Sequence, residues 1–246
     1  MQTLFNKFFS KKNKQTLPYC VDIHSHLIPG IDDGSKTIKE SIALIKQLKS
    51  FGFKKLITTP HIMEHKYPNS PSIILAGLDN LREELKSQNI NIEVDAASEY
   101  YLDEYFLKHL QKKDLLTFGD NYILFEMSYS LKPINLEQII NDIKTAGYKP
   151  VLAHPERYLF MHKDFDIYKK LKKEGVFFQV NLNSFSGYYS KPVQKIAEKI
   201  MQEGWIDFIG SDTHKMSHLE SFSKNINSTV LEKIFKKNKI LNDTLI

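Results

Sequence analysis

The sequence of 246 residues predicts an α/β fold in which parallel strands alternate with helices in a single barrel-type domain. Short apolar segments followed by helix-like segments recur about seven times along the chain. Neither a Gly-x-Gly-x-x-Gly turn nor a P-loop is present, so a barrel of seven or eight strands is favoured over an open nucleotide-binding sheet. Four predicted helices end at a glycine just before the next strand: Gly52, Gly147, Gly175 and Gly204.

The predicted strands are short and apolar, as expected for a parallel sheet that is buried on both faces. Helix starts are marked by a capping box at Thr37–Glu40, by Ser70 before Pro71, and by Asn135 as a predicted cap. The predicted strands are 19–26, 55–60, 90–97, 122–127, 150–153, 176–182 and 206–210. The predicted helices are 37–52, 70–87, 135–147, 164–174, 191–203 and 221–236, with a short helical or irregular piece before 112.

Composition limits the possible classes of protein. We predict a flexible Phe/Lys-rich tail over 1–18 and one domain over 19–246. No apolar run has the 18 or more residues of a membrane helix, and no signal peptide is recognisable, so we expect no membrane insertion. The only cysteine, Cys20, rules out an internal disulfide, which fits a cytoplasmic location. The net charge of +5 is spread thinly, and we expect no nucleic-acid partner.

His24 and His26 lie two residues apart on the first predicted strand, so both side chains point the same way. Two imidazoles on one face can reach the same cation, although a strand with two buried core histidines would have the same pattern. The loop that follows, Pro29–Gly34, combines turn formers with the carboxylates Asp32 and Asp33. This arrangement is typical of a metal site at the mouth of a barrel.

Further His, Asp and Glu residues recur where predicted strands end. Because the carboxyl ends of parallel barrel strands converge on one face, we predict that these side chains form one metal centre. Imidazole and carboxylate ligands without a thiolate favour Mn²⁺, Fe²⁺ or Zn²⁺, and the size of the set implies two or three ions. The predicted ligands are His24, His26, Asp33, His61, Glu99, Glu126, His154, Asp212 and His214.

Arg157 is one of only two arginines among 34 basic residues, and it follows His154 by three positions. A planar guanidinium at this mouth is suited to bidentate binding of phosphate oxygens. A surface ion pair with Glu156 is the alternative interpretation of Arg157. Arg82, the other arginine, is most simply a helix-surface residue.

Four blocks resemble the signatures of the PHP (polymerase and histidinol phosphatase) superfamily. They are Asp22-Ile-His-Ser-His26, Thr59-Pro-His61, Leu152-Ala-His-Pro-Glu-Arg-Tyr158 and Gly210-Ser-Asp-Thr-His214. More narrowly, His24–Gly34 together with His154-Pro-Glu-Arg157 resembles the bacterial manganese-dependent protein-tyrosine phosphatases of capsule synthesis. The resemblance covers about residues 19 to 235.

This resemblance implies a distorted (β/α)₇ barrel with a trinuclear centre. His24, His26, Glu99 and Asp212 would gather at one metal, and Glu99 would bridge to a second, completed by Glu126 and His154. Asp33, His61 and His214 would serve the third, with Asp33 rather than Asp32 as the ligand.

The implied reaction is hydrolysis of phosphotyrosine by a metal-activated hydroxide, with Mn²⁺ as the expected metal. The expected substrate is a phosphotyrosine protein, namely an autophosphorylating bacterial tyrosine kinase that regulates exopolysaccharide synthesis. Arg157, Asp33 and His61 are the predicted catalytic residues. Arg157, Tyr158 and Tyr101 are the predicted substrate-binding residues. No covalent intermediate is expected, because Cys20 lacks the arginine that Cys-x₅-Arg phosphatases place six positions later.

Three alternatives keep the same barrel. The chain could be a small-molecule phosphomonoesterase such as a histidinol-phosphate phosphatase, a metal-dependent nuclease, or a binding barrel with a degenerate site. The predicted mouth is rich in tyrosines, which could stack on a phosphotyrosine ring or reflect an AT-rich composition. These are Tyr100, Tyr101, Tyr129, Tyr158, Tyr188 and Tyr189.

Overall fold

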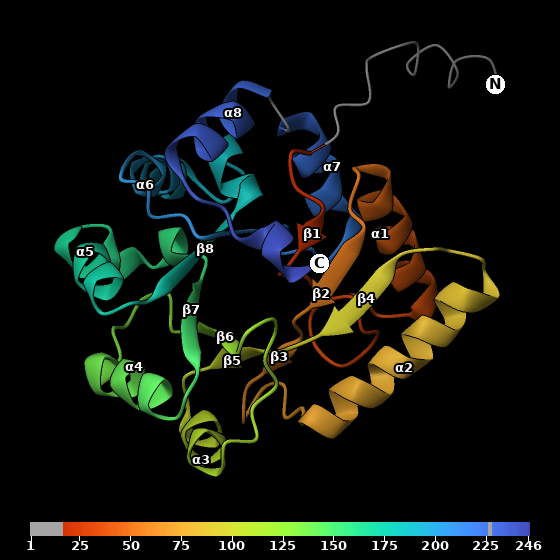
Figure 1. Cartoon of the computed structure of the whole chain (residues 1–246), viewed down its shortest axis with the longest axis horizontal. Helices are drawn as coiled ribbons and strands as arrows, with labels where there is room; N and C mark the ends of the chain where they lie inside the picture. The colour runs from red at the N-terminus through yellow and green to blue at the C-terminus, as the bar shows by residue number, and fades with distance from the viewer. Residues whose placement is uncertain (1–16, 226–227) are drawn as a thin grey trace.

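The computed structural model describes residues 17–225 and 228–246, in which helices surround a set of parallel strands (Figure 1). The predicted tail lies outside the described residues except for its last two positions. Of these, Leu17 is buried in the main core, and its amide lies 3.5 Å from the carbonyl oxygen of Phe51. The packed part of the chain therefore includes the end of the segment predicted as a tail.

Strand pairing is parallel throughout the described strands and has two sheets, β1-β2-β4 and β3-β5-β6-β7-β8-β9. The strands are β1 (Val21–Asp22), β2 (Lys55–Thr58), β3 (His61–Ile62), β4 (Glu93–Ala96), β5 (Glu99–Tyr101), β6 (Tyr122–Glu126), β7 (Lys149–Ala153), β8 (Phe177–Asn181) and β9 (Phe208–Gly210).

Two of the seven barrel strands are each interrupted and form two short strands. This explains why nine strands build a seven-stranded barrel. Only Thr59-Pro60 separates β2 from β3, and only Ala97-Ser98 separates β4 from β5. Pro60 has no amide hydrogen for a strand ladder. Pairing continues across both breaks, because Ala97 N–H donates to Thr58 O (2.9 Å) and Glu99 N–H donates to Pro60 O (3.1 Å).

The barrel is closed between the segment that follows β1 and the segment that follows β9. His26 N–H donates to Thr213 O at 2.9 Å, and Asp212 N–H donates to His24 O at 2.8 Å. Ser25 and Thr213 form the matching parallel bridge. The predicted distorted (β/α)₇ barrel is therefore confirmed, and its closure holds two ligand-bearing segments side by side.

The helices connect the strands and cover the outside of the barrel (Figure 1). Thr37 accepts a hydrogen bond from Glu40 N–H at the start of α1, and Ser70 accepts one from Ile73 N–H at the start of α2, as predicted. The α-helices are α1 (Ile38–Ser50), α2 (Pro71–Ser87), α3 (Glu104–Lys112), α4 (Leu136–Thr145), α5 (Asp166–Lys173), α6 (Lys191–Gln202), α7 (Met216–Asn225) and α8 (Ser228–Lys237).

Three details of the prediction are wrong. Asn135 precedes α4, but its side chain makes no capping hydrogen bond. The single helix predicted over 221–236 is two helices, α7 and α8. The strands are shorter than predicted, because apolar residues beside a strand also pack in the core without ladder pairing; Ile90 and Ile92, before β4, are examples.

Apolar packing divides into a large cluster between strands and helices and a smaller one that includes Leu124, Val151 and Phe208. The smaller cluster ends at Leu245 in the C-terminal 3₁₀ turn η5 (Asn242–Leu245), which lies beside β1 (Figure 1). Leu245 also approaches Gly119, where an added Cβ would lie 2.3 Å from its side chain. The C-terminal turn therefore closes the end of the barrel at which β6 begins.

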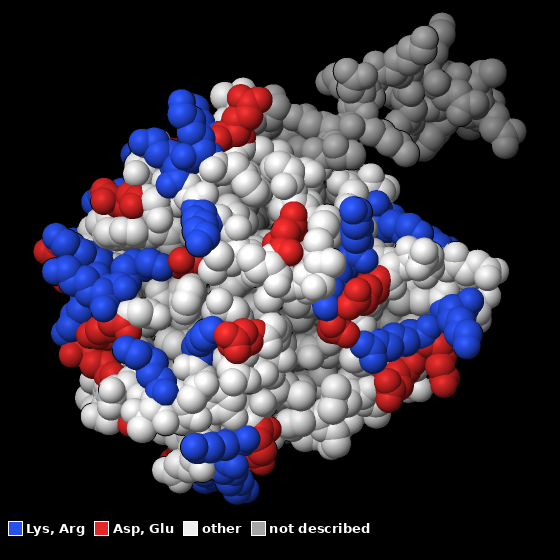
Figure 2. Space-filling model, viewed as in Figure 1, with Lys and Arg blue, Asp and Glu red and all other residues white. Residues whose placement is uncertain are grey.

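Charged groups of both signs are mixed on the face shown in Figure 2, with no continuous basic stripe there. Across residues 17–225 and 228–246, none of the helices combines the length and the apolarity that crossing a membrane requires.

We expect Asn242→Ala to lower the free energy of unfolding by about 2–4 kcal/mol, because burial of unpaired backbone groups is costly. The Asn242 side chain is fully buried, donates to Val21 O (2.9 Å) and Ile209 O (2.8 Å), and accepts from Ile209 N–H (2.9 Å). Urea unfolding would measure the loss. Exposed Asn91→Ala is the control, and an equal effect of both substitutions would contradict this role.

Candidate metal centre

His24 and His26 follow β1, and the Nε2 atoms of their two rings lie 3.4 Å apart. Both side chains are fully buried. The spacing of two residues does bring the two imidazoles to one point, as the sequence predicts. A buried pair of histidines packed only against apolar side chains is excluded, because carboxylates surround it.

Glu99 lies at the centre of this polar cluster and is 1% exposed. Its Oε2 is 3.1 Å from His24 Nε2, 3.4 Å from His26 Nε2 and 3.3 Å from His61 Nδ1. Its Oε1 is 2.9 Å from His154 Nε2. Four histidines therefore meet at one carboxylate, two from the segment after β1, one from β3 and one from the segment after β7.

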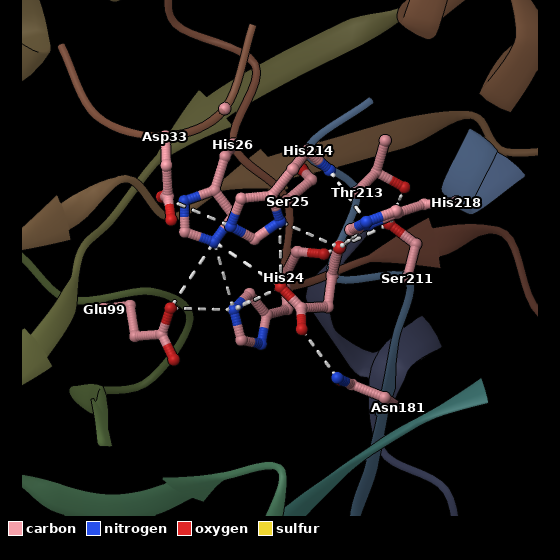
Figure 3. Close-up of polar contacts among 12 residues, drawn as sticks. His24, Ser25, His26, Asp33, Glu99, Asn181, Ser211, Thr213, His214 and His218 are labelled. Carbon is pink, nitrogen blue, oxygen red and sulfur yellow. Dashed lines mark hydrogen bonds and ion pairs between the residues drawn. The ribbon is translucent and has the colours of Figure 1, made fainter. Parts of the chain in front are cut away.

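All nine predicted ligands come together in four overlapping groups, and within each group the ligand atoms lie within 4.8 Å of one another. Figure 3 shows His24, His26, Asp33, Glu99 and His214 from this cluster. The groups are His26/Asp33/His61/His214, His24/Glu99/His154, His24/His26/Asp212 and His61/Glu99/Glu126. They differ in several respects from the division that the resemblance implies. His26 joins the group of Asp33, and His24 joins the group of His154. Glu126 is grouped with His61, which it contacts at 3.1 Å, and not with His154. How the ligands divide among ions stays a prediction.

Two neighbouring side chains orient the histidines. His24 Nδ1 lies 2.7 Å from Gln179 Oε1, and His26 Nδ1 lies 2.7 Å from Asp32 Oδ2. In each pair the ring Nδ1–H donates to the oxygen, so Nε2 is the nitrogen that faces the cluster and can bind a proton or a metal ion. Such partners fix the tautomer and ring orientation of metal-binding histidines.

The two adjacent aspartates have different surroundings. Asp32 is buried, and besides His26 its carboxylate accepts from Gly34 N–H (2.9 Å) and His61 N–H (3.0 Å). Asp33 Oδ1 instead lies 3.4 Å from both His61 Nε2 and His214 Nε2. The geometry therefore favours Asp33 as a ligand and Asp32 as a residue that orients His26 and the His61 backbone.

The donor set fits divalent metal ions. Buried carboxylates and imidazoles converge here, and burial of charge is costly without close compensation. His154 Nδ1 is buried without a hydrogen-bond partner, while its Nε2 points to Glu99. Neutral imidazole and carboxylate together suit first-row transition metals, with two or more ions needed to use nine ligands.

The carboxylates of the centre favour protonation of three of its histidines, His24, His61 and His214. Burial lowers the pKa of His24, but the Glu99 and Asp212 carboxylates outweigh it and raise that pKa to about 10. Burial likewise lowers the pKa values of His61 and His214, and nearby carboxylates raise both above their ordinary value. Metal binding must therefore displace protons from these rings.

The centre opens into a pocket of about 700 Å³. Arg157 and several of the predicted metal ligands line this pocket. Arg157 Nη1 donates to Asp212 Oδ2 at 3.0 Å. Glu156 is fully buried and accepts from Asn181 N–H (2.9 Å) and Ser184 Oγ (2.6 Å). The alternative of a surface ion pair between Arg157 and Glu156 is therefore wrong, because Glu156 points into the core.

The tyrosines divide into pocket-lining and buried residues. Tyr101, Tyr129 and Tyr189 line the pocket. Tyr158 is fully buried, and its hydroxyl accepts from Met127 N–H at 3.2 Å. This corrects the expectation that Tyr158 contacts substrate, because its ring belongs to the core. Tyr100 is also fully buried, and Tyr188 is exposed but does not line the pocket.

Several residues of the pocket and its surroundings are not among the predicted site residues. Tyr67 lines the pocket and stacks on His61 with ring centroids 5.4 Å apart. Lys66, Lys215 and His218 also line it. Gln179 and Asn181 alternate on an otherwise apolar strand, a polar period-two pattern that marks an inward-facing site and could have been found.

We expect Asp32→Ala to weaken metal binding by about 10- to 100-fold, because the orienting partner of His26 is removed. Isothermal titration calorimetry with Mn²⁺ would measure the affinity. Asp79→Ala, which removes a carboxylate whose side chain is 74% exposed on α2, is the control. Unchanged affinity in Asp32→Ala would rule out the orienting role.

Metal affinity should fall as the pH is lowered below about 10, because the raised pKa of His24 makes protons compete with the ion for the same nitrogen. Calorimetry at pH 8 and pH 6, in buffers of different ionisation enthalpy, would measure both the affinity and the protons released. Exposed His65→Ala should release the same number of protons as the unmodified chain. Binding without proton release would contradict the assignment of the histidines as ligands.

Residues 20–241 match the family model for capsular polysaccharide synthesis proteins of the CpsB/CapC type. The chain is 29% identical over 216 residues to the tyrosine-protein phosphatase YwqE of Bacillus subtilis strain 168, covering 87% of this chain and 85% of that protein. It is 26% identical to the putative tyrosine-protein phosphatase CapC of Staphylococcus aureus, covering 80% and 78% of the two chains.

The similar solved structures also include tyrosine phosphatases. A chain from the crystal structures of Bacillus subtilis YwqE and Streptococcus pneumoniae CpsB, described as metal-dependent tyrosine phosphatases, aligns with a TM-score of 0.73 and 26% identity, covering 89% of this chain and 96% of that one. The histidinol phosphate phosphatase of Lactococcus lactis aligns with a TM-score of 0.54 at 13% identity, covering 89% and 94%, a likeness of fold alone.

Proposed function

The chain belongs to the CpsB/CapC family of capsular polysaccharide synthesis proteins, and we propose that it is a metal-dependent protein-tyrosine phosphatase. The observation that carries this proposal is the cluster of nine metal-binding side chains, all but Asp33 buried or partly buried, that opens directly into a pocket with an arginine. The named tyrosine phosphatases among its relatives give the substrate class. No feature of the pocket favours histidinol phosphate or nucleic acid over phosphotyrosine.

The nine clustered residues would hold two or three divalent ions, for which Mn²⁺ is our first choice and Fe²⁺ and Zn²⁺ are alternatives. Such ions lower the pKa of water and stabilise charge on phosphoryl oxygens. Gln179 and Asp32 keep the histidine tautomers suited to this task, because each accepts the proton of a ring Nδ1. Asp33 and His61, proposed as catalytic residues, line the pocket, as does Glu99.

Arg157 would bind the phosphoryl group of the substrate. Its side chain is 24% exposed and lines the pocket that contains the ligands. One of its nitrogens already binds Asp212, so the other N–H groups are the ones available to phosphate oxygens. Tyr101 lines the same pocket and would contact the aromatic ring of the substrate.

We further propose that the substrate is a phosphotyrosine protein in the cytoplasm, namely a bacterial tyrosine kinase that phosphorylates itself and regulates exopolysaccharide synthesis. The family of capsular polysaccharide synthesis proteins supports this choice of pathway. The pocket is open, with room for a side chain presented on a protein segment. Failure to remove phosphate from such a kinase in its phosphorylated form would count against the proposal.

The metal-stripped, Mn²⁺-reconstituted protein should hydrolyse a phosphotyrosine peptide faster than histidinol phosphate or a short single-stranded DNA. Chelator should abolish turnover and added Mn²⁺ should restore it, whereas alkylation of Cys20 should have no effect. Steady-state release of phosphate measures the first two substrates, and gel analysis measures the third. Faster turnover of histidinol phosphate would move the function to a small-molecule phosphatase, and alkylation sensitivity would contradict the metal-dependent reaction.

We expect Arg157→Ala to lower kcat/KM for the phosphotyrosine peptide by about 100- to 1,000-fold, because it removes a charged donor from the phosphoryl group. Arg157→Lys should recover little, since an ammonium cannot reproduce the planar pair of donors. The other arginine offers a matched control. Arg82 binds Val94 O and Asp95 on the outer surface, so Arg82→Ala should keep full activity. Equal rates in Arg157→Ala and the unmodified chain would contradict the role.

A further inference from the structure

The guanidinium of Arg157 lies between two tyrosine rings. Its Cζ is 4.7 Å from the ring centroid of Tyr129 and 4.5 Å from that of Tyr189. Both distances are within the range of an attractive cation–π contact. The three residues come from three separate loops, after β6, β7 and β8, and all three line the pocket.

One edge of the same guanidinium is tied to Asp212. Asp212 Oδ2 accepts from Arg157 Nη1 (3.0 Å), from Asn181 Nδ2 (2.7 Å) and from the Tyr189 hydroxyl (3.4 Å). Its Oδ1 lies among the ligand histidines, 3.5 Å from His24 Nε2. Asp212 therefore presents one oxygen to the ligand cluster and the other to Arg157, which links the position of the arginine to that cluster.

An arginine side chain has many rotamers, and ordering it on binding reduces affinity. In this structure the two rings flank the guanidinium and one nitrogen is bonded, so the plane is set before a ligand arrives. The remaining N–H groups are then available in that plane. The contacts thus restrict the arginine in advance, so that less conformational freedom is lost when phosphate binds.

We propose that Tyr129 and Tyr189 are positioning residues that hold Arg157 ready for the phosphoryl group. The proposal rests on the proposed function, because it takes Arg157 as the phosphate-binding residue. The two rings act in different ways. Tyr129 contributes its ring face alone to the arginine, whereas Tyr189 adds a hydroxyl that contacts Asn181 (3.1 Å) and Asp212.

The test compares ring-keeping with ring-removing substitutions at both tyrosines. Binding of inorganic phosphate to the Mn²⁺-loaded protein is measured by calorimetry, and KM and kcat are measured with p-nitrophenyl phosphate. Tyr129→Leu and Tyr189→Leu should each weaken phosphate binding about 10-fold, equivalent to about 1.4 kcal/mol, and raise KM more than they change kcat. Tyr129→Phe should restore binding to within about threefold, and Tyr189→Phe should restore it less fully because the hydroxyl is lost.

A double-mutant cycle with Arg157→Ala separates positioning from mere packing. If the tyrosines act through Arg157, then adding either leucine substitution to Arg157→Ala should cause no further loss of phosphate affinity. Tyr105→Leu is the matched control, because Tyr105 stacks on His109 in α3 and does not line the pocket. Metal content and melting temperature of each variant show whether the centre and the fold stay intact.

Three outcomes would overturn the proposal: losses that add to the Arg157→Ala loss, leucine variants that bind phosphate as tightly as the unmodified chain, or leucine variants that lose metal along with phosphate. An unmodified chain that fails to bind phosphate would also overturn it. Failure of the proposed function has a different signature. In that case phosphotyrosine is not turned over, while calorimetry with phosphate still reports whether the two rings position Arg157.

Discussion

The rest of this structure depends on the contacts between the buried carboxylate of Glu99 and the histidines around it. Glu99 is 1% exposed and lies within 3.4 Å of ring nitrogens of His24, His26, His61 and His154. An isolated carboxylate could not be buried there without a large cost in free energy. Compensation has to come from several segments at once, so the barrel must bring these segments to one point. The same buried charges are the reason that the centre favours cations, whether protons or metal ions.

The barrel meets this requirement because its interior has an apolar part and a polar part. Apolar side chains such as Leu124, Val151 and Phe208 form a small core closed by Leu245 from the C-terminal turn. Polar side chains are placed toward the strand ends, where Gln179 and Asn181 reach His24 and Asp212. The two interrupted strands also place polar side chains in the site, because His61 and Glu99 each begin a short strand after an interruption. The apolar core and the candidate site therefore occupy different parts of one barrel.

Asp212 joins the cluster of predicted metal ligands to the side of the pocket that we propose binds phosphate. One carboxylate oxygen lies among the histidines, and the other holds Arg157, whose guanidinium is placed between Tyr129 and Tyr189. Residues from β6, β7, β8 and β9 loops thus share one network. In such a network the position of each donor depends on its neighbours, so that the pocket is ordered before substrate enters. This order is what a reaction at phosphorus requires, because its catalysis rests on positioning and charge.

The sequence by itself determined the alternation of strands and helices, the His, Asp and Glu residues that converge, and the place of Arg157 beside them, because these features depend on short-range patterns such as His24-Ser-His26 and on residue type. Only the tertiary structure decided the other features. It separated Asp32 from Asp33, placed Tyr158 in the core and Tyr189 on the arginine, turned Glu156 inward, and divided the last helix into two. Local pattern tells which residues can bind a metal or a ring, but which face a loop residue presents depends on packing against segments distant in the chain. That is why partners such as Tyr189, 32 positions from Arg157, could not be read from the sequence.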